Sequence, residues 1–314
     1  MHLSDRIGRR IKLQDVHILM TVAQAGSMGK AALQLNSSQP AVSRSIAELE
    51  QVLGVRLLDR HRRGIELTVY GRAFLECGAA AFDDLRRGVK DIEVLADPAA
   101  GEVRIGTNAN LGGSVVSAII DRQSRRHPRV VFRLLILDPK SLHRELIDRN
   151  VDLLISQKYD QLEDEQLEFE TLYNASYAVA AGAQHPWARR RRFNLSDLAD
   201  EPWVLPPPES PVGSIVTKAF RAAGTAYPRA TVFVAEAAVR ISLLSAGRFL
   251  TIVATSLLRF PIKRAEVKIL PVELPVIRAP IGIVTLKGRT LGAVAKRFIE
   301  SAREVTKPLA RGNL

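Results

Sequence analysis

Residues 27–53 decide how this chain folds at its N-terminal end, and they run SMGKAALQLNSSQPAVSRSIAELEQVL. Ser27 is a good N-cap, and the apolar residues after it recur at the spacing of a helix. These apolar residues are Met28, Ala31, Ala32 and Leu35. The LNSS stretch at 35–38 then interrupts the pattern with side chains that compete for backbone hydrogen bonds. The sequence therefore predicts two short helices joined by a tight polar turn.

The second of these helices has an apolar side and a polar side. Ser38 can cap it, and Pro40 is tolerated in its first turn, where an N–H has no partner within the helix. Its inward stripe consists of Val42, Ile46, Leu49 and Leu53. The outer residues are expected to contact DNA, and they are Ser37, Ser38, Gln39, Pro40, Ser43 and Arg44. A glutamine side chain suits adenine, whereas an arginine suits guanine or a phosphate. This pattern is typical of a helix-turn-helix, although a helical hairpin in a protein core could share it.

Residues 54–68, GVRLLDRHRRGIELT, predict two short strands around a basic tip. A basic hairpin directly after a recognition helix is a wing, which can contact the phosphate backbone beside the groove. The expected phosphate contacts are Arg60, Arg62 and Arg63. The wing favours DNA binding over the core hairpin.

The segment from residue 12 to residue 72 resembles the N-terminal domain of LysR-type transcriptional regulators. The resemblance is carried by QPAVSR at 39–44 and LGVRLLDR at 53–60, and as an order of elements it extends to about residue 305. Within the family, AGSMGK at 25–30 and SLLSAGRFLTIV at 242–253 resemble the branch of the galactose-binding-protein regulator. The resemblance implies a homodimer or homotetramer on double-stranded DNA, with RNA polymerase as a further partner.

The charge of the chain indicates an anionic partner. The formal net charge is +12, and residues 1–72 hold 11 Lys and Arg against 6 Asp and Glu. Nucleic acid is the first candidate and an acidic membrane surface the second. No apolar signal region or membrane-length stretch is present, so we expect a cytoplasmic protein with no membrane partner.

The sequence offers no constellation for catalysis. Cys77 is the single cysteine, and the six histidines show no paired metal spacing, so we expect neither a metal site nor a cofactor. Phosphate-binding glycine motifs and the GxSxG nucleophile motif are absent from the sequence. We therefore expect that the protein is not an enzyme.

A long amphipathic helix is predicted after the wing, with Thr68 as its cap. Its heptad positions are Phe74, Gly78, Ala81, Leu85, Gly88, Ile92 and Leu95. The periodicity leaves two partners open, the body of the same domain or the same helix of a second chain. The family resemblance implies a linker helix through which such regulators dimerise. DPAAG at 97–101 predicts a hinge after it.

Strands and helices alternate beyond the hinge. Residues 103–106, 130–137 and 151–155 predict strands, with helices between them, which implies a parallel sheet covered by helices. A second such run covers about 177–271, and the elements at 281–286 and 291–305 return to the first half. Two α/β lobes between which the chain passes twice resemble a type 2 periplasmic binding protein. The effector domains of the family resemble it in the same way.

The predicted fold is an N-terminal all-α winged helix-turn-helix domain plus a long linker helix, followed by an α/β two-lobed effector domain. The domains are the winged helix-turn-helix at 1–72, the linker or dimerisation helix at 69–96 and the effector domain at 101–305. Lobe I comprises about 101–174 and 276–305, and lobe II comprises about 175–275.

Polar residues follow several predicted strands of the effector domain, and ligands of such sheets bind beyond the carboxyl ends of strands. The residues expected to bind an effector are Thr107, Asn108, Asn110, Ser156 and Ser210. Their hydroxyls and amides suit a sugar or an organic acid, although each side chain could instead be a cap or turn residue.

The sequence thus predicts a sequence-specific DNA-binding transcriptional regulator whose activity is modulated by a small molecule bound between the two lobes. Two alternatives stay open at this point. One is a cytoplasmic ligand-binding α/β protein, and the other is a non-specific basic DNA-binding protein.

Overall fold

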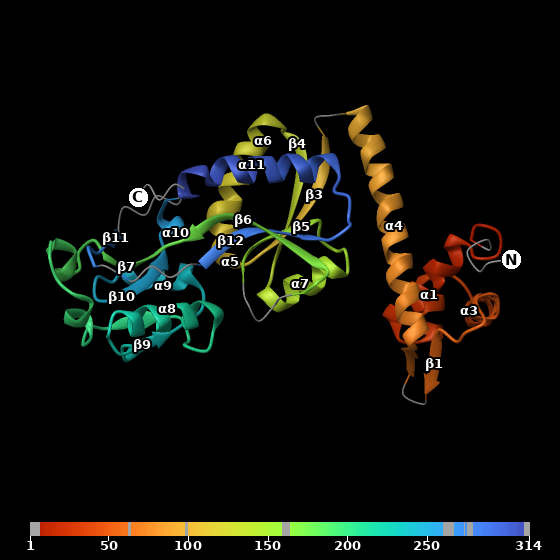
Figure 1. Cartoon of the computed structure of the whole chain (residues 1–314), viewed down its shortest axis with the longest axis horizontal. Coiled ribbons are helices and arrows are strands. Elements are labelled where there is room, and N and C mark those ends of the chain that lie inside the picture. The colour runs from red at the N-terminus through yellow and green to blue at the C-terminus, as the bar shows by residue number, and fades with distance from the viewer. Residues whose placement is uncertain are drawn as a thin grey trace. The chain divides into compact units, whose positions relative to one another are not determined.

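A computed structural model describes residues 7–61, 64–97, 100–158, 164–259, 267–272, 274 and 279–310. The chain divides into two compact units, Met1–Val89 and Lys90–Leu314 (Figure 1). Among the described residues, no helix is both long and apolar enough to cross a membrane.

The first unit is a three-helix domain with a two-stranded hairpin and the start of a long helix. Its elements are α1 (Leu13–Ala25), α2 (Met28–Gln34), α3 (Gln39–Leu53), β1 (Leu58–His61), β2 (Gly64–Leu67) and α4 (Val69–Ala96). The buried stripe of α3 is Val42, Ile46 and Leu49, each at most 1% exposed, and it packs in one core with Leu19 of α1 and Ala31 of α2. The two helices predicted for 27–53 are confirmed, and so are three residues of the predicted inward stripe, whereas Leu53 is half-buried against the same core.

Three residues in left-handed backbone conformation set the ends of these helices. Gly26 (φ 63°) ends α1 and Gly54 (φ 74°) ends α3, a conformation that glycine adopts without steric cost. Asn36 (φ 48°) turns the chain between α2 and α3, and asparagine tolerates this region better than most residues. The polar turn therefore lies where its sequence predicts it.

The hairpin of β1 and β2 is antiparallel and is fastened to α3 by a carboxylate. Glu50 Oε1 accepts hydrogen bonds from the N–H groups of Leu57 (2.7 Å) and Leu58 (3.1 Å). Thr68 then caps α4, because its hydroxyl accepts from the Gly71 N–H at 3.0 Å. The predicted strands and the predicted cap are confirmed.

The apolar stripe of α4 changes its surroundings along the helix. Phe74, Leu75 and Phe82 pack against the core of the first unit. Further along, four apolar side chains are exposed: Leu85 (51%), Val89 (59%), Ile92 (67%) and Leu95 (81%). The intrachain core thus accounts for the first half of the heptad pattern and leaves the second half uncovered.

Lobe I of the second unit is a five-stranded sheet in the order β4-β3-β5-β12-β6. Its strands are β3 (Ala100–Thr107), β4 (Arg129–Ile136), β5 (Leu153–Gln157), β6 (Leu167–Ala175) and β12 (Ala279–Leu286). Its helical segments are α5 (Ala109–Leu111), a π turn (Gly112–Val116), α6 (Ser117–Arg126), α7 (Pro139–Ile147) and α11 (Ala293–Ala310). Helices α6 and α11 cover one face, and α7 covers the other (Figure 1).

The prediction of a parallel sheet is correct only for β3, β4 and β5. Strand β12 runs antiparallel to both β5 and β6, so the sheet is mixed. Strand β12 comes from the returning segment of the chain and enters from the opposite end, which periodicity along the sequence does not show. The predicted return of the chain to the first half is confirmed.

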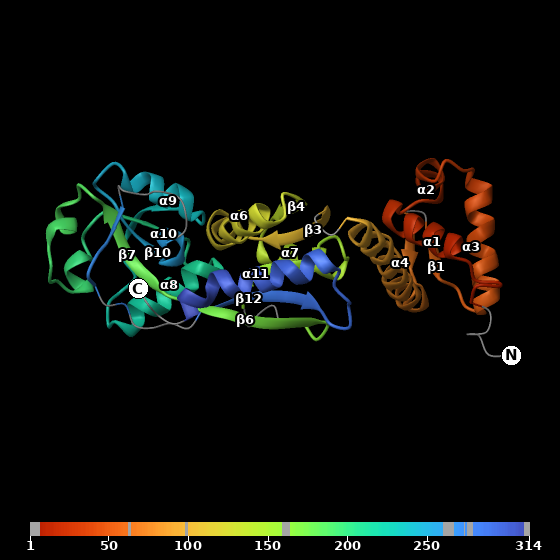
Figure 2. The same cartoon turned by 90° about the horizontal axis from the view of Figure 1, so that it is seen from above.

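Lobe II is a second five-stranded sheet, in the order β11-β7-β10-β8-β9. Figure 2 shows α9 and α10 near β7 and β10 of this sheet. Its strands are β7 (Tyr177–Gly182), β8 (Trp203–Leu205), β9 (Ala230–Phe233), β10 (Leu250–Ala254) and β11 (Val267–Ile269). Its helices are α8 (Pro211–Ala222), α9 (Ala237–Leu244) and α10 (Ser256–Arg259), with 3₁₀ turns at Pro186–Arg189 and Leu195–Leu198. Strands β8, β9 and β10 are parallel, whereas β7 and β11 are added antiparallel to their neighbours.

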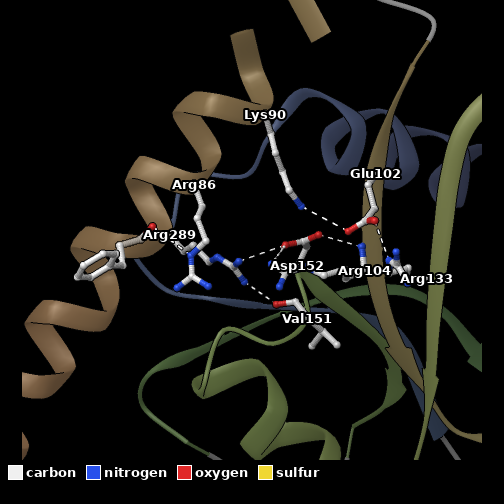
Figure 3. A network of polar contacts seen from close by, with 9 residues as sticks. Arg86, Lys90, Glu102, Arg104, Arg133, Val151, Asp152 and Arg289 are labelled. Carbon is white, nitrogen blue, oxygen red and sulfur yellow. Dashed lines mark hydrogen bonds and ion pairs between the residues drawn. The ribbon is translucent and has the colours of Figure 1, made fainter. Parts of the chain in front are cut away.

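A partly buried polar network connects the strands of lobe I with α4 and with Arg289 (Figure 3). Asp152, before β5, accepts hydrogen bonds from the Arg104 backbone (2.8 Å) and side chain (2.7 Å) and pairs with Arg289 at 3.2 Å. Burial alone would raise the pKa of Asp152, but the hydrogen bonds and charges of the two arginines outweigh burial and lower it. Nearby, Glu102 on β3 pairs with Arg133 of β4 and with Lys90, near the end of α4.

Asp152→Asn is expected to lower the free energy of unfolding at pH 7 by about 2–4 kcal/mol, because two partly buried guanidinium groups lose their carboxylate. The pKa of Asp152 is lower in the folded chain than in the unfolded chain. Its contribution is therefore present above the unfolded value of about 4 and is lost as the pH falls through the folded value. Urea unfolding of both proteins at pH 7 and pH 3 measures this.

Asp148→Asn is the matched control, since Asp148 is 53% exposed and its pairing with Arg144 is long at 3.7 Å. Asp148→Asn should lower the free energy of unfolding by less than about 0.5 kcal/mol. If Asp152→Asn cost as much at pH 3 as at pH 7, the carboxylate would not be the source of its contribution.

Candidate nucleic-acid interface and ligand cleft

The N-terminal half of α3 presents the residues that the sequence predicts for DNA contact. Ser38 is the N-cap, and its hydroxyl accepts from the Ala41 N–H at 3.4 Å, as expected. Ser27 occupies the N-cap position of α2, but its side chain makes no capping hydrogen bond. The exposed residues are Ser37, Ser38, Gln39, Pro40 and Arg44, whereas Ser43 is half-buried.

Arg44 lies on the outer side of α3 beside a groove that Ser37 also lines. None of the ion pairs within the described part of the chain involves Arg44, so its guanidinium is available to an outside anion. The Ser45 hydroxyl donates to Asp15 of α1 at 2.9 Å and thereby ties α3 to α1. The helix is thus fixed on one side and open to solvent on the other.

The wing is described only in part. Arg60 lies on β1 opposite Ile65 of β2, and the Ile65 N–H donates to Gly26 O at 3.2 Å. This hydrogen bond connects β2 to the end of α1. Arg62 and Arg63, which the sequence predicts as phosphate contacts, lie outside the described residues.

A narrow cleft lies between the two lobes of the second unit. Asn108 and Asn110 line it, from the loop and short helix after β3. Asn108 Oδ1 caps α5 by accepting from the Leu111 N–H at 3.0 Å. Asn110 Oδ1 accepts from the Ala237 N–H at 3.0 Å, which joins lobe I to the first residue of α9 in lobe II. The cleft is therefore bridged by a direct hydrogen bond between its lobes.

The other three residues predicted for effector contact have hydroxyls bonded to nearby backbone, and none of them lines the cleft. The Thr107 hydroxyl donates to Ile155 O at 2.8 Å, and Ser156 donates to Gln157 O at 3.2 Å. Ser210 caps α8 by accepting from the Gly213 N–H at 3.0 Å. Two of the five predicted residues thus line the cleft, and the other three do not.

Sequence reasoning missed several polar residues of the cleft. They are Ser114, Gln157, Tyr173, Tyr177, Arg240 and Ser256. Gln157 is the last residue of β5 and follows Ser156, which was predicted to bind the effector. Its polar side chain at the end of a strand is the signal that could have identified it. Tyr173 lies within β6, a strand for which no prediction was made. Arg240 lies on the helix α9, where an arginine is ordinarily a surface residue.

Burial strongly affects Tyr173. Its side chain is 3% exposed, and burial raises its pKa to about 12, although Ser256 opposes this slightly. The Tyr173 hydroxyl makes no hydrogen bond of normal geometry to any described residue. Its O–H can therefore bind a ligand in the cleft. Within the described chain, no group of three His, Cys, Asp or Glu side chains could hold a metal ion.

Comparison with known proteins matches both units to one family. The model of the LysR substrate binding domain matches residues 96–307, and that of the bacterial regulatory helix-turn-helix protein, lysR family, matches residues 13–72. HTH-type transcriptional regulator GbpR of Azospirillum brasilense is 25% identical over 295 residues, which cover 94% of this chain and 86% of that protein.

Solved structures show the same fold. Full-length CbnR complexed with its target DNA is 24% identical with a TM-score of 0.56, over 95% of this chain and 100% of that chain. A full-length OxyR variant from Pseudomonas aeruginosa is 18% identical with a TM-score of 0.66, over 96% and 97%. The family models cover most of the sequence and include both the helix-turn-helix and the domain that holds the cleft. The chain therefore belongs to the LysR family of DNA-binding transcriptional regulators, which are not enzymes, and it carries the family's substrate-binding effector domain.

Proposed function

We propose that this regulator reads operator DNA with the N-terminal half of α3 and that a small molecule in the interlobe cleft modulates this binding. The observation that carries the proposal is the division of α3 into a buried apolar stripe and an exposed polar face. A helix with this division can lie in the major groove while its domain stays folded. The GbpR and CbnR matches support the same role.

The proposed base contacts are made by Gln39 and Arg44. A glutamine amide can pair with the edge of adenine, and a guanidinium can pair with guanine or with a phosphate. The neighbouring Ser37, Ser38, Pro40 and Ser43 would lie against the groove, and Arg60, Arg62 and Arg63 of the wing would contact phosphates. Phosphate contacts position the domain, and base contacts select the sequence.

The proposed effector, a sugar or an organic acid, binds where Asn108 and Asn110 line the cleft. The hydroxyls of Thr107, Ser156 and Ser210 are bonded to nearby backbone, so these residues would support the walls of the cleft rather than contact the ligand. The Asn110–Ala237 hydrogen bond exists only when the lobes stand close together. A ligand that touches both lobes would favour that arrangement, and only such differential affinity can couple the cleft to DNA binding.

We further propose that α4, at about residues 69–96, is the dimerisation helix and that the protein assembles as a dimer or tetramer. The exposed apolar side chains in its second half support this, because a stripe of this kind is stabilised by a second helix. A dimer would present two α3 helices to a two-fold site. The regulator would act in the cytoplasm, where its DNA-bound form would contact RNA polymerase at a promoter.

Arg44→Ala is expected to cost about 1–3 kcal/mol of binding free energy on the selected operator and much less on random DNA, because a base contact is lost. Gel-shift titrations on an operator selected in vitro and on a random duplex measure both values. Lys30→Ala removes an equal charge from the exposed face of α2 and should weaken the two duplexes alike. An equal loss on both duplexes for Arg44→Ala would rule out base reading by this residue.

Replacing both Arg62 and Arg63 by Ala should weaken every duplex to the same extent. Two lost phosphate contacts should reduce the slope of log K against log salt by about 2, since each contact releases about one counterion. Titrations between low and moderate salt measure the slope, with Arg44→Ala as the comparison. A slope equal to that of the wild type would remove these residues from the interface.

The double substitution Leu85→Glu and Ile92→Glu should dissociate the oligomer, because it places charges in the exposed apolar stripe of α4. Light scattering after size exclusion should show the mass falling toward 34.6 kDa, the mass of one chain. Leu33→Glu is the control, since Leu33 is 78% exposed on α2, outside the stripe. An unchanged mass for the double variant would assign the contact to another surface.

A further inference from the structure

Arg240 lines the cleft and is almost fully buried, with 1% of its surface exposed. It lies on α9 of lobe II and donates from Nη1 to Val234 O (2.9 Å) and Ala235 O (2.6 Å). Its Nε is buried and has no hydrogen-bond partner in the described chain. An N–H in this situation is rare in folded proteins and calls for an acceptor that the protein itself does not supply.

The charge of Arg240 is also uncompensated. Burial is the largest effect on the guanidinium and lowers its pKa to about 10, so the group is still protonated at pH 7. The carboxylate that acts on it belongs to Glu236, an exposed residue, and no ion pair of the described chain includes Arg240. A buried cation of this kind is ordinarily paired with an anion.

The rest of the cleft lining suits an anion as well. Among the described residues, Arg240 is the only charged side chain that lines the cleft, and neither Asp nor Glu does. Hydrogen-bond donors line the same cleft: the amides of Asn108 and Gln157 and the hydroxyls of Tyr173 and Ser256.

We propose that the effector is a small organic oxyanion whose carboxylate, phosphate or sulfate group binds the guanidinium of Arg240. The Nε donor and the positive charge of Arg240 meet the oxyanion, and the donors of lobe I bind the remainder of the ligand. Because Arg240 belongs to lobe II and the asparagines to lobe I, one such ligand bridges both lobes. The inference rests on the proposed effector function and narrows its ligand to one chemical class.

The test measures thermal unfolding of the full-length protein with four probes: sulfate, phosphate, succinate and, as the neutral match for succinate, succinamide. Ionic strength is held constant with sodium chloride. Wild-type protein should gain about 2–5 °C in Tm with at least one oxyanion and less than about 1 °C with succinamide, since ligands of the folded state stabilise it.

Arg240→Gln should abolish this gain. Arg248→Gln, which removes an exposed arginine of lobe II, should keep it. Because sulfate and phosphate stabilise proteins in general, the difference between these two variants is the quantity that counts. Arg240→Lys keeps the positive charge but lacks the guanidinium group, and it replaces Arg240→Gln in the test if that variant does not fold. A smaller gain in Tm than in the wild type is then expected.

Three results would overturn the inference: the same oxyanion gain in wild type and Arg240→Gln, a gain with succinamide equal to that with succinate, or no oxyanion gain in the wild type. The proposed effector function is tested separately by gel shift with the same probes. If an oxyanion raises the Tm only when Arg240 is present but leaves the DNA affinity unchanged, the anion site is supported and the effector function is contradicted. If a neutral ligand changes the DNA affinity of the wild type and of Arg240→Gln alike, the effector function is supported and the assignment of the effector as an oxyanion is contradicted.

Discussion

The burial of one side of α3 against α1 and α2 is the packing interaction on which the proposed DNA reading by α3 depends. Val42, Ile46 and Leu49 are almost fully buried, and burying each such side chain is worth about 1.5–3 kcal/mol. Successive residues of a helix are separated by about 100°, so rotating α3 by a single position would expose part of this stripe. The same packing therefore fixes which residues face outward, and Glu50 of the same helix fastens the wing beside them.

The cleft depends on a second interaction, the meeting of its two lobes at Asn110 and Ala237. The hydrogen bond between them is modest in energy, so the two lobes can separate without unfolding either sheet. Close to it lies a buried guanidinium that lacks an anion. An occupant that supplies the missing negative charge would add to the interlobe contacts, and it would shift the domain toward the closed arrangement by its difference in affinity for the two states.

The helix-turn-helix could be predicted closely because its signals are local. Helical spacing locates the stripe of α3, and residues that favour turns locate its start. The antiparallel addition of β12 to the sheet of lobe I could not be predicted, since strand pairing over such separations leaves no periodic trace in the sequence. The cleft was predicted in part for a similar reason. Polar residues at strand ends identified Asn108 and Asn110, but whether a hydroxyl such as that of Thr107 is already bonded depends on its tertiary neighbours. Arg240 was missed because its lack of an acceptor is visible only in the folded chain.

The central claim is that paired α3 helices select a particular DNA sequence. Genome-wide mapping of the sites occupied by the wild-type protein in cells tests it most directly. The account predicts that the occupied sites share a sequence with two half-sites related by two-fold symmetry, separated by about 10 base pairs or a multiple of this spacing. Occupied sites without any shared sequence would contradict sequence reading by α3 and leave only charge-driven binding to DNA.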